Sequence, residues 1–440
     1  MQIDARTAAL EALLQVKDNE GYSNIVIDKT LRKYEMDKRD SALANIIFYG
    51  VLERKITLDY IISRFLTKKS MKLSSACELI LESAVYQIMY LDKVPDSAAV
   101  NEAVNLAKKH KCPHSFVNGV LRSIIREKEK LTLPSGTDAK SLSIKYSIPE
   151  DLISMWQSSY GEEVTAKLLE SFTEKSRVYL RVNNTRNTTA DFLRSFEGSD
   201  VNVETYPHHD NTCIIRSSGD ITKLPQFEEG LFHVQDLSSQ YLCDIVNPQE
   251  NETVVDVCAA PGGKTFTMAE KMNGTGTVYS YDLYKGRVKL IFTGAKRLGL
   301  ENVRAFVRDA ATADTHGILA DRVLCDVPCS GYGTIRKKPE IRYKALDTVS
   351  DLPEIQYRIL CNSKEFVKPG GLLVYSTCTL NPEENNLIAA KFLRENPDFV
   401  SEPVKLKVNR AVKENDYELT MMPYLTGTDG FFAASFRRIK

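Results

Sequence analysis

From about residue 250, short runs rich in β-branched residues alternate with segments of helical period. The runs are TVVDV, TVYSYD, VRAFVRD, RVLCDV and GLLVYST, and GRVKLIFTGAKRLG is typical of the segments between them. Strands that alternate with helices pair in parallel, because each helix carries the chain back to the edge from which the next strand starts. The pattern predicts an α/β domain over residues 231–440, with a parallel sheet covered by helices on both faces.

Aspartates stand at the ends of four consecutive predicted strands. At any single strand end an aspartate is equally well explained as a turn or capping residue. Ligands of such sheets bind outside the carboxyl ends of the strands, and an acidic residue after the second strand typically accepts hydrogen bonds from a ribose diol. Four aspartates at equivalent strand ends together favour a nucleoside ligand with a cationic part. These aspartates are Asp256, Asp282, Asp309 and Asp326.

The loop after the first predicted strand, CAAPGGKT, brings Gly262 and Gly263 to the start of a helix predicted near Lys264. Glycines let backbone N–H groups approach a ligand closely, and a helix N-terminus favours a negatively charged group. The spacing matches neither GxGxxG nor GxxxxGK[ST]. On its own, this turn is weak support for ligand binding.

Two cysteines follow strand ends: Cys329 in DVPCSGYGT and Cys378 in YSTCTLNPEEN. Cys325 lies inside its strand, where alternation directs it to the core. The nucleophilic form of cysteine is the thiolate, and a helix beginning near Pro382 or the charge of Lys264 could favour it.

A thiolate can attack C6 of a pyrimidine, so that C5 can accept a methyl group from a sulfonium donor. Asp326 is placed to stabilise the charge that develops near N3. A second thiol would then assist release of the product.

Composition and cysteine spacing limit the classes of protein to which the chain can belong. The chain has 440 residues, 58 basic and 58 acidic side chains, and nine cysteines without a CxxC pair. No histidine lies at ligand spacing from a cysteine, so we expect neither a disulfide framework nor a metal site. The opening MQIDARTAALEALLQV lacks the apolar core of a signal peptide, so we expect a cytoplasmic protein without a membrane segment. Core positions are expected for Cys77, Cys112, Cys213, Cys243 and Cys361.

The sequence before residue 231 divides into two further parts. Residues 1–135 have helical period throughout, and residues 140–230 indicate a small α+β module after the turn-rich LTLPSGTDAKSLS. A basic stretch near the end of the helical part is equally consistent with a solvated helix face and with an RNA-contacting surface. Its basic residues are Lys108, Lys109, Lys111, Arg122, Arg126, Lys128 and Lys130.

Over nearly its full length the sequence resembles the RsmB/Sun family of RNA cytosine-C5 methyltransferases. DVCAAPGGKT resembles the donor-binding loop of that family, DVPCSGYGTIRKKPEIRY its proline-cysteine motif and substrate loop, and YSTCTLNPEEN its threonine-cysteine motif. FYGVLERKITLDYII and VPDSAAVNEAVNLAKK resemble its NusB-like helical domain, LRVNNT and FHVQDLSSQ its connecting module, and DGFFAASFRR its closing strand. Val327 departs from the family, which more often has alanine there.

The resemblance implies a multidomain protein: an all-α NusB-like RNA-binding domain, a small α+β connecting module and a Rossmann-like class I methyltransferase domain. It implies methylation of a cytosine in 16S rRNA, typically cytosine 967, with S-adenosylmethionine as donor, in a protein expected to be a monomer. Cys378 would be the nucleophile and Cys329 would assist release, with Asp326 and Lys264 beside them. The donor would contact Cys258, Ala259, Ala260, Pro261, Gly262, Gly263, Lys264, Asp282 (ribose), Asp309 (adenine) and Asp326.

The loop TIRKKPEIRY combines cations with an aromatic ring, which suits phosphate contacts and base stacking, although a solvated loop has the same composition. Because C5 is approached from the ring face, we expect an unstacked cytosine. Two alternatives remain open: the same chemistry on transfer RNA, and a non-catalytic RNA-binding assembly factor. The candidate RNA-contacting residues are Arg336, Lys337, Lys338, Arg342 and Tyr343.

Overall fold

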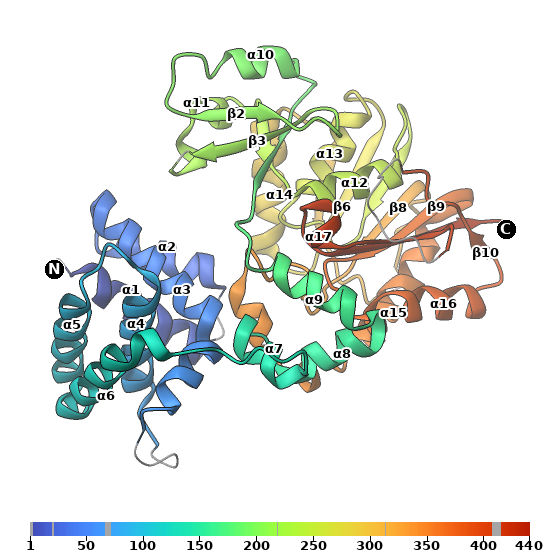
Figure 1. Cartoon of the computed structure of the whole chain (residues 1–440). Coiled ribbons are helices and arrows are strands. Elements are labelled where there is room, and N and C mark those ends of the chain that lie inside the picture. The colour runs from blue at the N-terminus through green and yellow to red at the C-terminus, as the bar shows by residue number, and fades with distance from the viewer. Residues whose placement is uncertain (1–2, 20–21, 67–71, 218, 313, 407–414) are drawn as a thin grey trace. The chain divides into compact units, whose positions relative to one another are not determined.

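The computed structural model describes residues 3–19, 22–66, 72–217, 219–312, 314–406 and 415–440 (Figure 1). The chain divides into two compact units. The first comprises Met1–Thr173 with Lys337–Lys344, and the second comprises Glu174–Arg336 with Ala345–Lys440. None of the described helices combines the length and the apolar character that crossing a membrane requires.

The first unit is helical, as the sequence predicted for residues 1–135. Residues 139–171, which the sequence assigned to the small α+β module, are also helical and belong to this unit. Its apolar core is built from side chains that recur every three or four residues, such as Ile47, Val51 and Leu58 on one helix, all nearly inaccessible to solvent. Aspartate and serine side chains cap two of the helices by accepting backbone N–H groups. The helices are α1 (Ala5–Asn19), α2 (Ser23–Lys33), α3 (Lys38–Ser63), α4 (Ser75–Tyr90), α5 (Asp96–Lys109), α6 (His114–Glu127), α7 (Ala139–Tyr146), α8 (Glu150–Tyr160) and α9 (Glu162–Ser171).

The second unit contains a small antiparallel sheet in the order β2-β3-β1-β4. Its core includes Leu180 and Val182 on β1 and Phe192 on a covering helix. The elements are β1 (Val178–Val182), α10 (Thr189–Arg194), β2 (Asn202–Thr205), β3 (Thr212–Ser217), α11 (Pro225–Glu228) and β4 (Phe232–Val234).

The larger sheet of the second unit has the order β10-β12-β9-β8-β5-β6-β7, and β11 pairs with β12. Strands β5 to β9 are parallel, as predicted, whereas β12 runs antiparallel to β9. The strands are β5 (Thr253–Asp256), β6 (Thr277–Asp282), β7 (Val303–Val307), β8 (Ala320–Asp326), β9 (Val367–Thr377), β10 (Phe399–Ser401), β11 (Glu418–Met421) and β12 (Phe431–Arg438).

Alternating strand residues fill two separate cores. Val254 and Leu324 point to the face packed by α12 (Leu237–Val246), α13 (Gly263–Lys271) and α14 (Lys285–Leu298). Val255 and Cys325 point to the face packed by α15 (Leu352–Ser363) and α16 (Asn386–Glu395). Because successive side chains of a strand point to opposite faces, this alternation produces the predicted helices on both sides of the sheet.

Candidate active site

The turn after β5 has a shape that depends on glycine. Gly262 has φ +114°, and a Cβ atom there would lie 2.3 Å from the Phe266 ring. Helix α13 starts at Gly263, within one residue of the predicted start. The turn therefore brings the first N–H groups of α13 to the carboxyl end of the sheet.

A cavity of about 200 Å³ lies at this turn. Two buried polar atoms on residues that line it have no hydrogen-bond partner in the structure: Nε2 of Gln235 and Oδ1 of Asp256. Buried polar groups are normally paired, so one donor and one acceptor are available to a polar ligand. The cavity is lined by Val234, Gln235, Asp236, Ser239, Asp256, Cys258, Ala259, Ala260, Pro261, Gly263, Lys264 and Asp326.

Asp256 is fully buried at the end of β5, and its Oδ2 accepts a hydrogen bond from the Thr265 hydroxyl at 2.7 Å. Burial raises the pKa of Asp256 to about 7, against the opposing effects of the Thr265 bond and of the Lys264 charge. A cationic ligand in the cavity would favour the charged form of this carboxyl group.

Lys264 and Asp326 form an ion pair at the same cavity. Lys264 Nζ lies 2.8 Å from Asp326 Oδ2, and the Ser376 hydroxyl donates to Asp326 Oδ1 at 2.8 Å. Burial acts to lower the pKa of Lys264, but the Asp326 charge and hydrogen bond, with a smaller effect of Cys378, raise it above the ordinary lysine value. Lys264 therefore stays positively charged beside Cys378.

The two cysteines at strand ends face each other, with 3.3 Å between Cys329 Sγ and Cys378 Sγ. The hydrogen bond with Cys378 and burial raise the pKa of the Cys329 thiol well above its ordinary value. Cys325 is fully buried, as predicted, and burial raises its pKa to about 12. The structure thus distinguishes the Cys329–Cys378 pair at the strand ends from Cys325, whose thiol lies in the core.

The cysteine loops are held by groups other than the thiols. The Ser330 and Thr379 hydroxyls are 2.6 Å apart, and the Gly333 N–H donates to the Cys378 carbonyl at 3.0 Å. Glu384, fully buried, accepts from the Ser330 N–H at 2.9 Å and from the Gln356 amide at 2.8 Å. The backbone at both cysteines is therefore fixed independently of sulfur chemistry.

The helix expected to begin near Pro382 starts later. Pro382–Glu384 forms a single 3-10 turn, and α16 begins at Asn386. The Asn385 side chain accepts from the Thr377 hydroxyl at 2.6 Å and donates to the Thr379 carbonyl at 3.0 Å. These bonds end the strand and delay the helix.

Asp282 and Asp309 do not line the 200 Å³ cavity. Asp282 is buried and lies 3.5 Å from the Arg287 guanidinium, which also donates to the Ala260 carbonyl at 2.9 Å. Asp309 is exposed and accepts from the Ala311 N–H. Arg287, which the sequence analysis did not identify, joins the strand end of β6 to the turn after β5.

The predicted RNA-contacting residues fall into two groups. Arg336 donates to the Gly427 carbonyl at 2.9 Å and to the Thr428 carbonyl, and Lys337 and Lys338 are partly exposed. Lys338 Nζ lies 5.1 Å from the centre of the Tyr22 ring.

Arg342 and Tyr343 differ from the expectation. Arg342 is 3% exposed and donates to the Glu53 carbonyl at 2.7 Å. The Tyr343 hydroxyl donates to the Leu52 carbonyl at 2.7 Å and lies 3.0 Å from the Ser147 hydroxyl. In this structure neither side chain is available for RNA, because both are packed against α3 and the end of α7 inside the first unit.

Three cavity-lining residues on the segment from β4 into α12 were not predicted: Gln235, Asp236 and Ser239. Asp236 caps α12 by accepting from the Ser238 N–H at 2.9 Å and also accepts from the Asp429 N–H at 3.3 Å. Across the described residues, no group of three or more histidine, cysteine, aspartate or glutamate side chains could hold a metal ion.

Comparison with known proteins gives a consistent assignment along the chain. Residues 243–437 match the model of the 16S rRNA methyltransferase RsmB/F family, residues 3–126 the NusB family, and residues 148–222 the ferredoxin-like domain of RsmF/B-like methyltransferases.

Individual proteins agree with these matches. A probable ribosomal RNA small subunit methyltransferase B of Bacillus subtilis (strain 168) is 38% identical, over 98% of each chain. The crystal structure of PH0851 has a TM-score of 0.84 with 26% identity, covering 100% of both chains. The crystal structure of NSun6 from Pyrococcus horikoshii with SFG has a TM-score of 0.61 with 20% identity, over 66% of this chain and 98% of that one.

Proposed function

The chain belongs to the RsmB/F family of 16S rRNA methyltransferases, and from this premise we propose that it methylates C5 of a cytosine in 16S rRNA through a covalent bond between Cys378 and C6. The observation that carries the proposal is the pair of thiols, 3.3 Å apart, beside the Lys264–Asp326 ion pair.

We assign the role of nucleophile to Cys378 for two reasons. The charged Lys264 lies beside it, and a neighbouring cation stabilises a thiolate. Cys378 also stands in the threonine-cysteine motif, which in the family that the sequence resembles carries the nucleophile. The hydrogen bond with Cys378, together with burial, raises the pKa of the Cys329 thiol, in keeping with a thiol that assists release.

In the proposed reaction the Cys378 thiolate adds to C6, and the electron pair of the C5–C6 double bond becomes available at C5. A proton from water adds to N3, and Asp326 accepts the resulting N3–H hydrogen bond. The electron pair at C5 forms the bond to the methyl carbon as the bond from that carbon to the sulfonium sulfur breaks. C5 then loses its proton to water, the C5–C6 double bond re-forms as the C6–S bond breaks, and N3 returns its proton to water. Cys329 assists this release by donating its hydrogen bond to the departing Cys378 thiolate.

The cavity at the turn after β5 suits S-adenosylmethionine, which supplies an electrophilic methyl group. Nε2 of Gln235 and the N-terminus of α13 match the carboxylate of its methionine part, and Oδ1 of Asp256 matches its amino group. The turn from Cys258 to Lys264 would hold this part, with Asp326 beside it. Asp282 would accept the ribose hydroxyls and Asp309 would contact the adenine.

For RNA, we propose contacts from Arg336, Lys337 and Lys338, with cytosine 967 as the target. We also propose domain boundaries near residues 135 and 230 and a monomeric protein. The exposed basic residues of the first unit, among them Lys108, Lys109 and Arg122, are compatible with an additional phosphate contact.

The assignment of the thiols is tested by exchanging them one at a time. We expect Cys378→Ser to abolish methyl transfer to a 16S rRNA transcript. Cys329→Ala should form the bond to C6 but release it slowly, giving a protein–RNA adduct on a denaturing gel. An adduct that persists in Cys378→Ser but is absent from Cys329→Ala would reverse the two roles.

The substrate is tested by bisulfite sequencing of ribosomal and transfer RNA from cells with and without the gene. We expect one lost 5-methylcytosine in small-subunit RNA. Loss confined to transfer RNA would refute the target while leaving the chemistry intact. No lost mark, together with no calorimetric signal for S-adenosylmethionine, would favour a non-catalytic assembly factor.

A further inference from the structure

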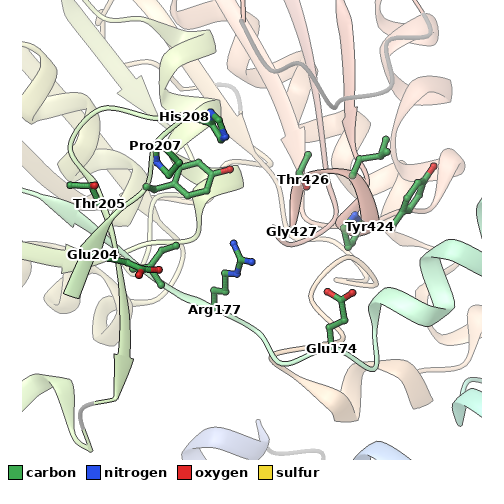
Figure 2. Close-up of a pocket in the computed structure, with 13 residues that line it drawn as sticks. Glu174, Arg177, Glu204, Thr205, Pro207, His208, Tyr424, Thr426 and Gly427 are labelled. Carbon is green, nitrogen blue, oxygen red and sulfur yellow. The ribbon is translucent and has the colours of Figure 1, made fainter. Parts of the chain in front are cut away.

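The second unit contains another cavity, of about 330 Å³, which does not overlap the one at the turn after β5. One wall comes from the small sheet: the chain leading into β1, the end of β2 and the turn after it. The opposite wall comes from α17 (Pro423–Thr426) and Gly427, which connect β11 to β12. Figure 2 shows Arg177 projecting into the space between the two walls, with His208 on one side and Tyr424 on the other.

The lining of this cavity combines flat rings with one guanidinium group. The rings belong to Tyr206, His208 and Tyr424, and the centres of the Tyr206 and His208 rings are 5.6 Å apart in an edge-to-face arrangement. Aromatic and guanidinium planes are the surfaces on which proteins stack unpaired bases. The volume lies at the lower end of the range for small-molecule sites.

The charges of the lining favour a base over a phosphate group. Two carboxylates, Glu174 and Glu204, face the single cation Arg177. Arg216 forms an ion pair with Glu204 at 2.6 Å and so partly offsets one of them. Carboxylate oxygens repel phosphate but accept hydrogen bonds from the amino groups of bases.

Backbone hydrogen bonds connect this cavity to the proposed catalytic pair. Gly427 lies three residues before Gly430, a stretch that spans at most about 11 Å. The Gly430 N–H donates to the Gly333 carbonyl at 2.8 Å, and the Gly333 N–H donates to the Cys378 carbonyl at 3.0 Å. The wall formed by α17 is thus a near neighbour of the nucleophile within the same unit.

We propose that this cavity holds one unstacked base of the RNA strand, near the target cytosine in sequence, and thereby helps to select the substrate. The inference rests on the proposed function for its ligand class, since only an RNA substrate would bring a base here. Tyr424 and Arg177 are the residues on opposite walls that would contact the base.

The experiment measures binding of the full-length chain to an RNA oligonucleotide that covers the 16S segment it protects from nuclease. Tyr424→Ala removes a ring, and Tyr424→Phe is the matched control that keeps it. We expect Tyr424→Ala to weaken binding about tenfold, within the range for loss of one stacked base, and Tyr424→Phe to stay within twofold of the unchanged chain. S-adenosylmethionine affinity should be the same in all three proteins, which excludes misfolding.

Single abasic positions in the same RNA identify the nucleotide. With the unchanged chain, one abasic position outside the target cytosine should weaken binding about tenfold, and Tyr424→Ala should show no additional loss at that position. Equal losses for both proteins at every position would overturn the proposal. Because this readout needs no methyl transfer, a failure of the proposed chemistry appears separately, as normal RNA binding without product.

Discussion

Replacing Asp256 by asparagine tests the electrostatics of the strand end. The folded chain binds the Asp256 proton up to a pKa of about 7, whereas the unfolded chain releases it near 3.8. Between these values the unfolded state binds fewer protons, so the free energy of unfolding falls as pH rises and levels off above pH 7. Three pH units correspond to at most roughly 4 kcal/mol. Asp256→Asn removes this titration, while its Oδ1 can still accept the Thr265 hydrogen bond.

The assay is urea unfolding of both proteins from pH 4.5 to 8, followed by circular dichroism, without added ligand. The two unfolding free energies should be similar at the acid end, and Asp256→Asn should become the more stable protein by a few kcal/mol at pH 8. Asp321→Asn is the matched control with the opposite sign. Its carboxylate lies 3.0 Å from Lys368, and although burial opposes it, hydrogen bonds from the Thr253 N–H and Lys368 lower its pKa.

For Asp321 the unfolded state binds more protons, so its contribution to stability is present above its unfolded pKa and is lost as pH falls through the lower folded value. Because the assay stays above that unfolded pKa of 3.8, Asp321→Asn should destabilise the protein by nearly the same amount from pH 4.5 to 8. A difference between Asp256→Asn and the unchanged chain that does not vary with pH would refute the reasoning about the buried carboxyl group.

Two further substitutions probe the loops of the site. Gly262→Ala should lower S-adenosylmethionine affinity at least tenfold in calorimetry, because it adds a clash with Phe266 to a strained φ. Gly274→Ala is the control for strain alone, since Gly274 has φ +74° and a Cβ there would meet nothing within 4 Å. Equal S-adenosylmethionine affinity in both variants would contradict the role of the Gly262 turn. Glu384→Ala should cost about 3 kcal/mol of stability and lower kcat, because the Ser330 N–H and the Asn381 amide lose this acceptor and the Gln356 amide keeps only its bond to the Pro328 carbonyl. An unchanged kcat would contradict the positioning role of Glu384.

Much of the larger sheet could be predicted from sequence because its strands are marked locally. Runs of β-branched residues between helical segments correctly located β5 to β9, and the resemblance to a known family located the closing strand β12. The short strands β2, β3 and β4 were not predicted. β3 and β4 pair antiparallel with β1, β2 pairs antiparallel with β3, and Phe192 and Phe232 fill the core of this sheet. These strands therefore depend on contacts between residues distant in sequence.

The candidate site was predictable where a motif carries its own geometry and unpredictable where tertiary packing decides. Cys329 and Cys378 are 49 residues apart, and the parallel pairing of β8 with β9 brings the ends of their strands together. Arg342 and Lys338 are basic residues of the same loop, so the sequence predicts RNA contacts for both. In the structure the Arg342 guanidinium is buried against the Glu53 carbonyl. No sequence pattern marks Gln235 as a residue of the cavity, because its place in the lining depends on how α12 packs beside the turn after β5.

The arrangement of the two cysteine loops also makes the thiol substitutions interpretable. Ser330, Gly333 and Glu384 fix the loops through hydroxyl, backbone and carboxylate contacts, and none of these contacts includes a sulfur atom. Removing one thiol therefore removes an acid or a nucleophile without removing the bonds that position its neighbour. A change in product release after Cys329→Ala would consequently report on chemistry at the Cys378 sulfur, because the loop that carries Cys378 would remain in place.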